Sequence, residues 1–193
     1  PVCKAFFTDM ATEVSNYGIQ VYGGHGYIRE WGMEQLVRDT RIAQIYEGTN
    51  GIQAADLIGR KLTRSNGTMM QATHDVFTDI ANNITVAANQ QQAHALLAEW
   101  HNLSQALLEA NAEHCAAVAC DYLNYVSYTL IGVLWLSMLD TLPNTANRAY
   151  AKGKIKTGEF YLSNLLPRAQ LHKQAVEQGA NAVNATELSD FIG

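Results

Sequence analysis

The sequence predicts an all-α protein, with an antiparallel helical bundle followed by a second helical bundle. Proline is rare, with three residues in 193, so little would interrupt a helix. Ala, Leu and Gln, which favour helices, are abundant, and runs of β-branched residues are few. Apolar residues recur every three or four positions, as in Val76, Ile80 and Ile84, which is the period of an amphipathic helix.

The front of the chain is expected to hold three helices. The first covers about residues 4–22, and a glycine-rich loop follows as far as Gly32. A short helix is expected over about 34–45, and another over about 50–63. Asn50 and Gln53 have the spacing of a capping box, which predicts that this last helix begins at Asn50.

The cluster Ser65-Asn66-Gly67 is typical of a turn and divides the chain into two expected domains, residues 1–66 and 67–193. The second domain keeps the helical period, as in Leu96, Trp100 and Leu103, which predicts another bundle. Pro167 is expected to kink or restart its last long helix.

Residues 122–138 form the most apolar stretch and carry no charge, and basic residues follow them, so a membrane span has to be weighed. The stretch contains polar side chains such as Asn124 and Ser127, and between Asp121 and Asp140 it is barely long enough for a bilayer. We therefore expect a buried helix of the bundle and no membrane span.

The charge distribution argues against nucleic-acid binding. The formal net charge is −5, and the chain from Ser65 to Asn147 contains no Lys or Arg, so it would repel phosphate backbones. Lysines return at Lys152, Lys154 and Lys156, which we interpret as a solvated helix face.

Cysteines and histidines do not predict a metal site. The three cysteines are an odd number without a framework spacing, and no secretory signal is recognisable, so we expect a reducing cytoplasm. His94 and His101 could share a helix face, and Cys115 and Cys120 are near each other in sequence, but neither pair is a closed zinc ligand set. The chain also has no nucleophile-elbow or phosphate-loop motif.

The segment Ile45-Tyr46-Glu47-Gly48-Thr49 is the most informative, because it puts a single acid in an apolar, glycine-flanked setting. Gly48 has no side chain to keep a ligand away from the backbone. A lone carboxylate in such a setting is either a catalytic base or an anchoring group.

Four segments of the front part occur together in a recognisable order. They are Phe7-Thr8-Asp9-Met10-Ala11-Thr12-Glu13, Gln20-Val21-Tyr22-Gly23-Gly24-His25-Gly26-Tyr27, Arg38-Asp39-Thr40-Arg41-Ile42, and Ile45-Tyr46-Glu47-Gly48-Thr49 with Ile52-Gln53. With them, residues 4–62 resemble the C-terminal helical domain of the flavin-dependent acyl-CoA dehydrogenases. The back part more loosely resembles the extra C-terminal bundle of the longer bacterial members, through Gly158-Glu159-Phe160-Tyr161 and Leu165-Leu166-Pro167-Arg168.

The resemblance implies that Glu47 is the catalytic base, which removes the proton α to the thioester carbonyl while the β-hydride passes to FAD. Free glutamate is too weak a base for this proton, so the site is expected to desolvate the carboxylate, against the effect of the helix beginning near Asn50. The backbone N–H of Glu47 is expected to help hold the thioester oxygen. Tyr46 and Gly48, beside the base, are expected to contact the substrate.

The resemblance also implies that the glycine loop and the turn after the base hold the FAD of the neighbouring subunit. By position this indicates Gln20, Gly23 and Gly24, with Thr49 beside them. Many relatives carry Gln where this chain has Gly51, so that flavin contact is in question.

The implied partners are an acyl-CoA substrate, an electron-transfer flavoprotein, and further copies of the chain in a homodimer or tetramer. The domains expected ahead of residue 1 are missing, so we expect a piece of a longer enzyme that is inactive alone and exposes apolar helix faces. Two alternatives stay open: a non-catalytic helical module for assembly or binding, and an acyl-CoA oxidase.

Overall fold

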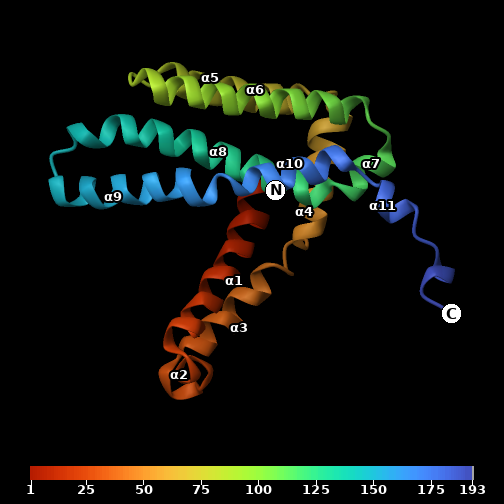
Figure 1. The fold of residues 1–193 in the computed structure, drawn as a ribbon, viewed down its shortest axis with the longest axis horizontal. Coiled ribbons are helices and arrows are strands. Elements are labelled where there is room, and N and C mark those ends of the chain that lie inside the picture. Colours follow the sequence, from red (N-terminus) through yellow and green to blue (C-terminus); the bar gives the residue numbers. More distant parts are fainter. Residues whose placement is uncertain (193) are drawn as a thin grey trace.

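The computed structural model describes residues 1–192, and every element within that range is helical. The helices form an arm and a body (Figure 1). The arm is a hairpin of α1 (Val2–Tyr22) and α3 (Met33–Ala43), with the short helix α2 (Gly24–Tyr27) at its tip. The body contains the helices that follow. The predicted all-α class is confirmed.

The loop at the tip of the arm is more helical than predicted. Besides α2 it contains the 3-10 turn η1 (Arg29–Trp31), and glycines with positive φ angles stand at the breaks, Gly23 at 59° and Gly32 at 74°. A single helical turn needs no apolar periodicity, so the sequence pattern could not reveal either turn.

The third predicted helix of the front part is continuous but changes type. It begins as α4 (Asn50–Asp56) and continues as the π-helix η2 (Leu57–Arg64). The hydroxyl of Thr63 donates to the carbonyl of Ile58, five residues earlier, at 2.9 Å. The helix ends at the predicted turn, where Asn66 and Gly67 both have positive φ.

The body is built around one central helix, α8. Its elements in chain order are α5 (Thr68–Asn82), α6 (Ala87–Glu109), α7 (Ala112–Ala117), α8 (Ala119–Thr141), η3 (Leu142–Asn144), α9 (Arg148–Phe160), η4 (Tyr161–Leu165), α10 (Arg168–Gln178), α11 (Asn181–Asn184) and η5 (Leu188–Asp190). Helix α8 packs against α10, α6, α4 and α1. As predicted, Pro167 marks the restart of the last long helix.

The apolar stretch takes the buried place expected of it. Within the described chain one segment, Ala119–Asn144, is long and apolar enough to cross a membrane, and 56% of its most apolar window is buried in this protein. Inside the body the phenol of Tyr122 accepts from the indole N–H of Trp100 at 3.2 Å and lies 2.7 Å from the Ser104 hydroxyl. Ser104 in turn donates to the carbonyl of Trp100, which closes a ring of satisfied polar groups.

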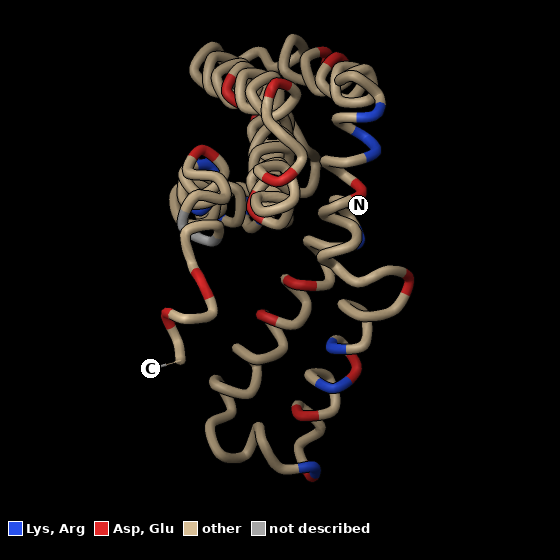
Figure 2. Tube along the Cα trace, turned by 90° about the vertical axis from the view of Figure 1, so that its right-hand side faces the viewer, with Lys and Arg blue, Asp and Glu red and all other residues tan. Residues whose placement is uncertain are grey.

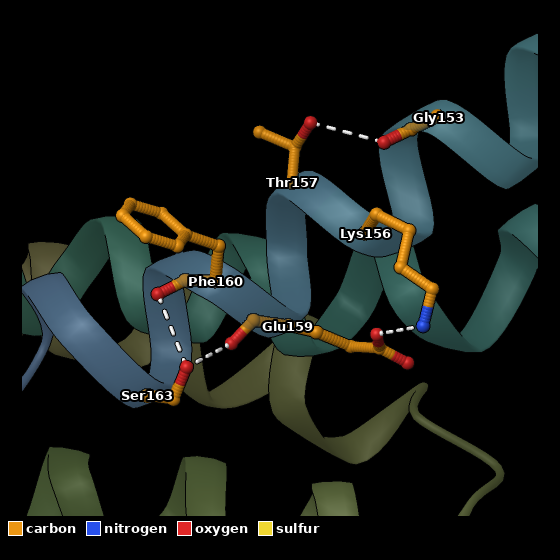
Figure 3. A network of polar contacts seen from close by, with 6 residues as sticks. All are labelled: Gly153, Lys156, Thr157, Glu159, Phe160 and Ser163. Carbon is orange, nitrogen blue, oxygen red and sulfur yellow. Dashed lines mark hydrogen bonds and ion pairs between the residues drawn. The ribbon is translucent and has the colours of Figure 1, made fainter.

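Basic and acidic side chains are distributed unevenly among the helices. Figure 2 shows that α5 to α8 carry Asp and Glu but no Lys or Arg, whereas α3, η2 and α9 carry Lys or Arg. On α9, Lys156 pairs with Glu159 at 2.6 Å, and the ring of Phe160 points away from the helix (Figure 3). Lys154 lies over the ring of Trp135, 5.8 Å from its centre. Lys152 and Lys156 are exposed, as expected of a solvated face.

The arm is tied to the body by both apolar and charged contacts. The ring of Phe6 meets Tyr128 edge to face at 4.9 Å. The guanidinium of Arg168 lies 3.2 Å from Glu13 and donates to the Tyr128 hydroxyl at 3.4 Å. The hydrogen bond from Tyr17, together with Arg168, holds the pKa of Glu13 below its usual value. These contacts hold the root of the arm against α8 and α10.

Candidate active site

The predicted base lies in the turn between α3 and α4, at the root of the arm. Glu47 has a φ of 56°, and Gly48 follows with 81°. Among the described residues only Glu47 and Asn66 combine a side chain with a positive φ. This conformation is unfavourable for a residue with a Cβ, so the surrounding structure has to stabilise it.

Hydrogen bonds from both sides hold the turn. The Gln53 side chain donates to the carbonyl of Glu47 at 3.0 Å, and the backbone N–H of Asn50 donates to the carbonyl of Gln44 at 3.2 Å. From the first helix, the Lys4 ammonium donates to the carbonyl of Gly48 at 2.7 Å. The backbone around Glu47 is therefore held by three separate segments of the chain.

Asn50 links this turn to α1 through its side chain. Its Oδ1 accepts from Lys4 at 2.7 Å, and its Nδ2 donates to the carboxylate of Asp9 at 2.6 Å and to the carbonyl of Ala5 at 3.1 Å. Gln44, on the other side of the turn, donates to the same Asp9 oxygen at 2.6 Å. A partly buried polar network thus positions the turn on the first helix.

Two functional groups of Glu47 lack a partner in the described chain. The side chain is exposed, and within residues 1–192 its carboxylate has no hydrogen-bond or ion-pair partner. The backbone N–H of the same residue likewise has no acceptor in the described chain. The desolvation expected for a strong base is therefore not supplied by these residues. Tyr46, beside it, is 52% exposed.

The cap of the following helix lies one residue earlier than predicted. Thr49 is the N-cap of α4, and its Oγ1 accepts from the backbone N–H of Ile52 at 3.3 Å. The expected capping box of Asn50 and Gln53 is therefore wrong, because Asn50 bonds to the first helix and Gln53 bonds to Glu47. The helix still begins directly after the turn, where its N-terminus favours a negative charge.

The predicted flavin-binding loop lies at the tip of the arm. Gln20, Gly23 and Gly24 are all exposed there. A Cβ added to Gly24 would meet nothing within 4 Å, and its φ is not positive, so nothing in the described chain requires glycine there. A Cβ added to nearby Gly26 would lie 2.6 Å from the carbonyl of Ile19. Packing thus accounts for Gly26, whereas Gly24 leaves open backbone that a ligand could approach.

The sequence led us to expect Thr49 beside this loop, but the structure does not place it there. Thr49 lies at the root of the arm and the glycine loop at its tip, with α3 between them (Figure 1). The 11 residues of α3 span about 16 Å at the rise of an α-helix. One copy of the chain therefore presents two separate groups of predicted flavin contacts.

Large apolar side chains are exposed along the arm, as the sequence led us to expect. On α1, Phe7, Val14 and Val21 follow one another at intervals of seven residues and are 55%, 64% and 84% exposed. This spacing puts all three on one face of the helix. An exposed apolar stripe of this kind is typical of a surface that packs against other protein.

A cleft of about 630 Å³ opens where the start of α1 meets the body. Its lining is mainly apolar and includes Phe7, Met69, Trp100 and Leu134, with Lys61 as its cation. None of the predicted site residues lines it. The cleft and the turn that carries Glu47 are therefore separate features.

Sequence reasoning missed the residues that hold the turn in place. The sequence pattern assigns no role to Lys4, Asp9 or Gln44, and it favours only a capping role for Asn50. The available signal was weak: Lys4 and Thr8 are four residues apart and so share one helix face, with Asp9 next to them. Nothing in that spacing indicates which distant segment the face contacts.

Two family models together match nearly the whole chain. Residues 1–63 match a model described as "Acyl-CoA dehydrogenase, C-terminal domain", and residues 58–187 match one described as "Acetyl-CoA dehydrogenase C-terminal like". The second match covers most of the chain, including all of α5 to α10.

Several curated proteins are similar over most of the chain. A 3-methylmercaptopropionyl-CoA dehydrogenase of Ruegeria pomeroyi is 35% identical over 90% of this chain. A butyryl-CoA dehydrogenase of Syntrophomonas wolfei is 33% identical over 86%, and the broad-specificity linear acyl-CoA dehydrogenase FadE5 of Mycobacterium tuberculosis is 25% identical over 99%. The chain spans 26%, 30% and 34% of the lengths of these three relatives.

Proposed function

The chain belongs to the acyl-CoA dehydrogenase family, as a C-terminal portion of it, and from this premise we propose that it supplies the catalytic base of an acyl-CoA oxidation. The reaction converts an acyl-CoA thioester to the trans-2-enoyl-CoA. Glu47 removes the α-proton in this proposal. The turn with the positive φ at Glu47 carries the proposal, because it leaves the carboxylate and the backbone N–H of the same residue without a partner in the described chain.

The two groups of Glu47 suit two parts of one reaction. The carboxylate takes the α-proton, and the negative charge that develops on the thioester oxygen needs a hydrogen-bond donor. The free backbone N–H of Glu47 is such a donor, with its position fixed through Lys4 and Gln53. Tyr46 and Gly48 flank the base and are the proposed substrate contacts.

Because Glu47 is exposed, the proposed catalytic site needs further protein, beyond this chain, to cover the carboxylate. A carboxylate in water is a weak base, and burial by further protein would strengthen it. The chain spans about a third or less of its relatives, and the apolar stripe on α1 offers a surface for such protein. We therefore propose that residues 1–193 alone do not catalyse the reaction.

The residues proposed for the flavin site fit the chemistry of FAD. Gly24 has open space for a pyrophosphate at its backbone, and Gln20 is an exposed donor beside it. The Thr49 hydroxyl accepts from Ile52 and keeps its own proton to donate. When bound, FAD accepts the β-hydride of the substrate. From the family resemblance we propose that Gln20, Gly23 and Gly24, together with Thr49, serve the flavin of a neighbouring subunit.

The remaining parts of the function follow from the same premise. We propose an acyl-CoA as the substrate, an electron-transfer flavoprotein as the electron acceptor, and a homodimer or tetramer in the cytoplasm as the assembly. The division into residues 1–66 and 67–193 is part of the proposal, with the second unit serving packing and subunit contacts.

The proposal is tested by Glu47→Gln in the full-length protein that contains this chain. The probes are butyryl-CoA and 3-methylmercaptopropionyl-CoA, the substrates in the names of two relatives. We expect the flavin absorbance to stay at the wild-type level while exchange of the substrate α-proton with deuterium and the reduction of flavin are abolished. The amide keeps the shape of the side chain and removes its basicity.

Glu109→Gln is the matched control, because Glu109 is an exposed glutamate at the end of α6. Its carboxylate has no hydrogen-bond partner in residues 1–192. It should leave both measurements unchanged. Substantial turnover by Glu47→Gln would refute the assignment of the base. A full-length product that binds no flavin at all would instead favour a helical assembly module.

A further inference from the structure

Two histidines that are distant in sequence meet where α5 and α6 run side by side (Figure 1). The ring centres of His74 on α5 and His101 on α6 are 5.3 Å apart, with the planes at 62°. Both residues are half-buried. The sequence spacing indicates only the pair of His101 with His94, which lies on the same helix, α6.

Each ring holds one buried nitrogen without a partner. His74 Nε2 and His101 Nδ1 are shielded from solvent, and neither has a hydrogen-bond partner in the part of the chain that the structure describes. Buried polar atoms in folded proteins are nearly always paired, and an exception often marks a bound water or ion. Two such atoms on adjacent rings point to one shared ligand.

The contacts of His74 leave its Nε2 available to a metal ion. Its Nδ1 lies 3.3 Å from the hydroxyl of Thr78, one helical turn further along α5. If Nδ1 carries the proton and donates to Thr78, the lone pair is on Nε2, the nitrogen that lacks a partner. A second hydrogen bond of this kind orients most histidines that bind metal ions in proteins. The indole of Trp100 covers the same ring, with centres 5.8 Å apart.

The ring separation fits one metal ion bound by both histidines. A Zn–N bond of about 2.0 Å plus roughly 1.2 Å from the nitrogen to its ring centre puts each centre about 3.2 Å from the ion. At a tetrahedral angle the two centres are then about 5.2 Å apart. The observed separation is 5.3 Å.

We propose that His74 and His101 form a binding site for a divalent transition-metal ion of the zinc class, through Nε2 and Nδ1 respectively. Imidazole suits zinc, nickel and copper, and the pair supplies two protein ligands. No group of three or more metal-binding side chains occurs among residues 1–192, so this is not a closed structural zinc site.

The charge around the pair favours a cation. The chain from Ser65 to Asn147 has no Lys or Arg, and α5 carries Asp75 next to His74. A divalent ion therefore meets no repulsion from a positively charged Lys or Arg on α5 or α6. The site is built from residues of the body only and shares none with the turn that carries Glu47, so it goes beyond the proposed oxidation.

The test is calorimetric titration of the full-length protein that contains this chain with Zn²⁺ after treatment with a chelator. We expect one equivalent to bind saturably and the melting temperature to rise with Zn²⁺. His74→Gln and His101→Gln should each weaken binding by about tenfold or more, because each removes one of two protein ligands. Thr78→Val should weaken it less, because it removes only the hydrogen bond behind His74.

His94→Gln is the matched control, since it removes a half-buried histidine of the same helix, two turns from His101. It should leave the affinity for Zn²⁺ unchanged. Circular dichroism and melting in the presence of chelator show whether each variant is folded before titration. Absence of saturable binding in the wild type, or a loss smaller than tenfold in either His74→Gln or His101→Gln, would overturn the proposal.

Discussion

The ammonium of Lys4 donates a 2.7 Å hydrogen bond to the carbonyl oxygen of Gly48, so the first helix directly holds the turn next to the proposed base. The same ammonium reaches Asn50 at 2.7 Å. The position of Glu47 thus depends on a residue more than forty positions earlier in the chain.

Lys4→Met is expected to loosen this turn while the helix stays intact, because it keeps a long apolar side chain and removes the donor. Amide hydrogen exchange should become faster around Gln44 and Asn50, whose backbone hydrogen bond closes the turn. Lys152→Met, on an exposed lysine of α9, is the control and should leave exchange there unchanged. Equal protection in wild type and Lys4→Met would contradict the role of Lys4.

Asn50→Ala should destabilise the junction between α1 and α4 more strongly. It removes the hydrogen bonds to Lys4, Asp9 and Ala5, and it leaves partly buried groups on α1 unpaired. We expect the free energy of unfolding to fall by about 1–3 kcal/mol in urea denaturation. Asn102→Ala, on an exposed asparagine of α6, should change it by less than about 0.5 kcal/mol. Similar losses in both variants would show that the network does not stabilise the fold.

Tyr122→Phe tests the hydrogen-bonded ring inside the body. The change leaves the aromatic packing in place but removes the acceptor of the Trp100 indole and the partner of the Ser104 hydroxyl. An indole N–H left unpaired in the core should lower the free energy of unfolding by about 1–3 kcal/mol. Tyr150→Phe, on a side chain that is 54% exposed, should be nearly neutral. A neutral Tyr122→Phe would mean that the ring contributes no net stability.

Replacing either of two glycines of α9 with alanine should change the stability of the protein, in opposite directions for the two positions. A Cβ at Gly158 would lie 2.8 Å from Trp135 and 3.0 Å from Leu139, so Gly158→Ala should separate α9 from α8 and destabilise the protein by about 1–3 kcal/mol. A Cβ at Gly153, also on α9 (Figure 3), meets nothing within 4 Å. Gly153→Ala should therefore stabilise it by about 0.5–1 kcal/mol. Thermal melting of the two variants measures both changes in stability. If both variants became more stable, or both less stable, the packing described here would be contradicted.

The hydrogen bonds of Asp140 predict that the stability of the protein decreases at acid pH. Its carboxylate accepts from the backbone N–H groups of Val86 at 2.7 Å and Thr85 at 3.0 Å, where α6 begins, and these bonds hold its pKa below the usual value. A carboxyl whose pKa is lowered by folding stabilises the protein above its unfolded pKa, and the effect disappears as the pH falls through the folded pKa.

The measurement is the melting temperature of wild type and Asp140→Asn between pH 7 and pH 2. The variant should melt at a lower temperature than wild type near neutral pH, and the difference should shrink below about pH 4, where an aspartate begins to protonate in the unfolded chain. A difference that is constant over the whole range would show that the charge of Asp140 is not involved.

The cap of α4 shows where prediction from local pattern stops. Thr49 and Asn50 are adjacent, and both side chains are suited to cap a helix. The spacing of Asn50 and Gln53 favoured Asn50, but the structure uses Thr49. The deciding contacts come from Lys4 and Asp9 on α1, which engage the Asn50 side chain. Local sequence contains no information about those distant partners.

The sequence by itself determined the features that depend on neighbouring residues. The helical class, the buried character of α8, the turn at Ser65-Asn66-Gly67 and the restart after Pro167 all follow from apolar period, backbone freedom and the fixed φ of proline. The family was also recognisable, because its motifs are continuous segments of the chain.

Only the tertiary structure decided what depends on how helices pack. It placed Glu47 in an exposed turn, separated Gln20 and Gly24 from Thr49 by the length of α3, and brought His74 to His101. Each of these relationships joins residues on different elements, and their distance is set by helix packing and not by spacing in the chain. The chemistry proposed for Glu47 and for the histidine pair therefore depends on that packing.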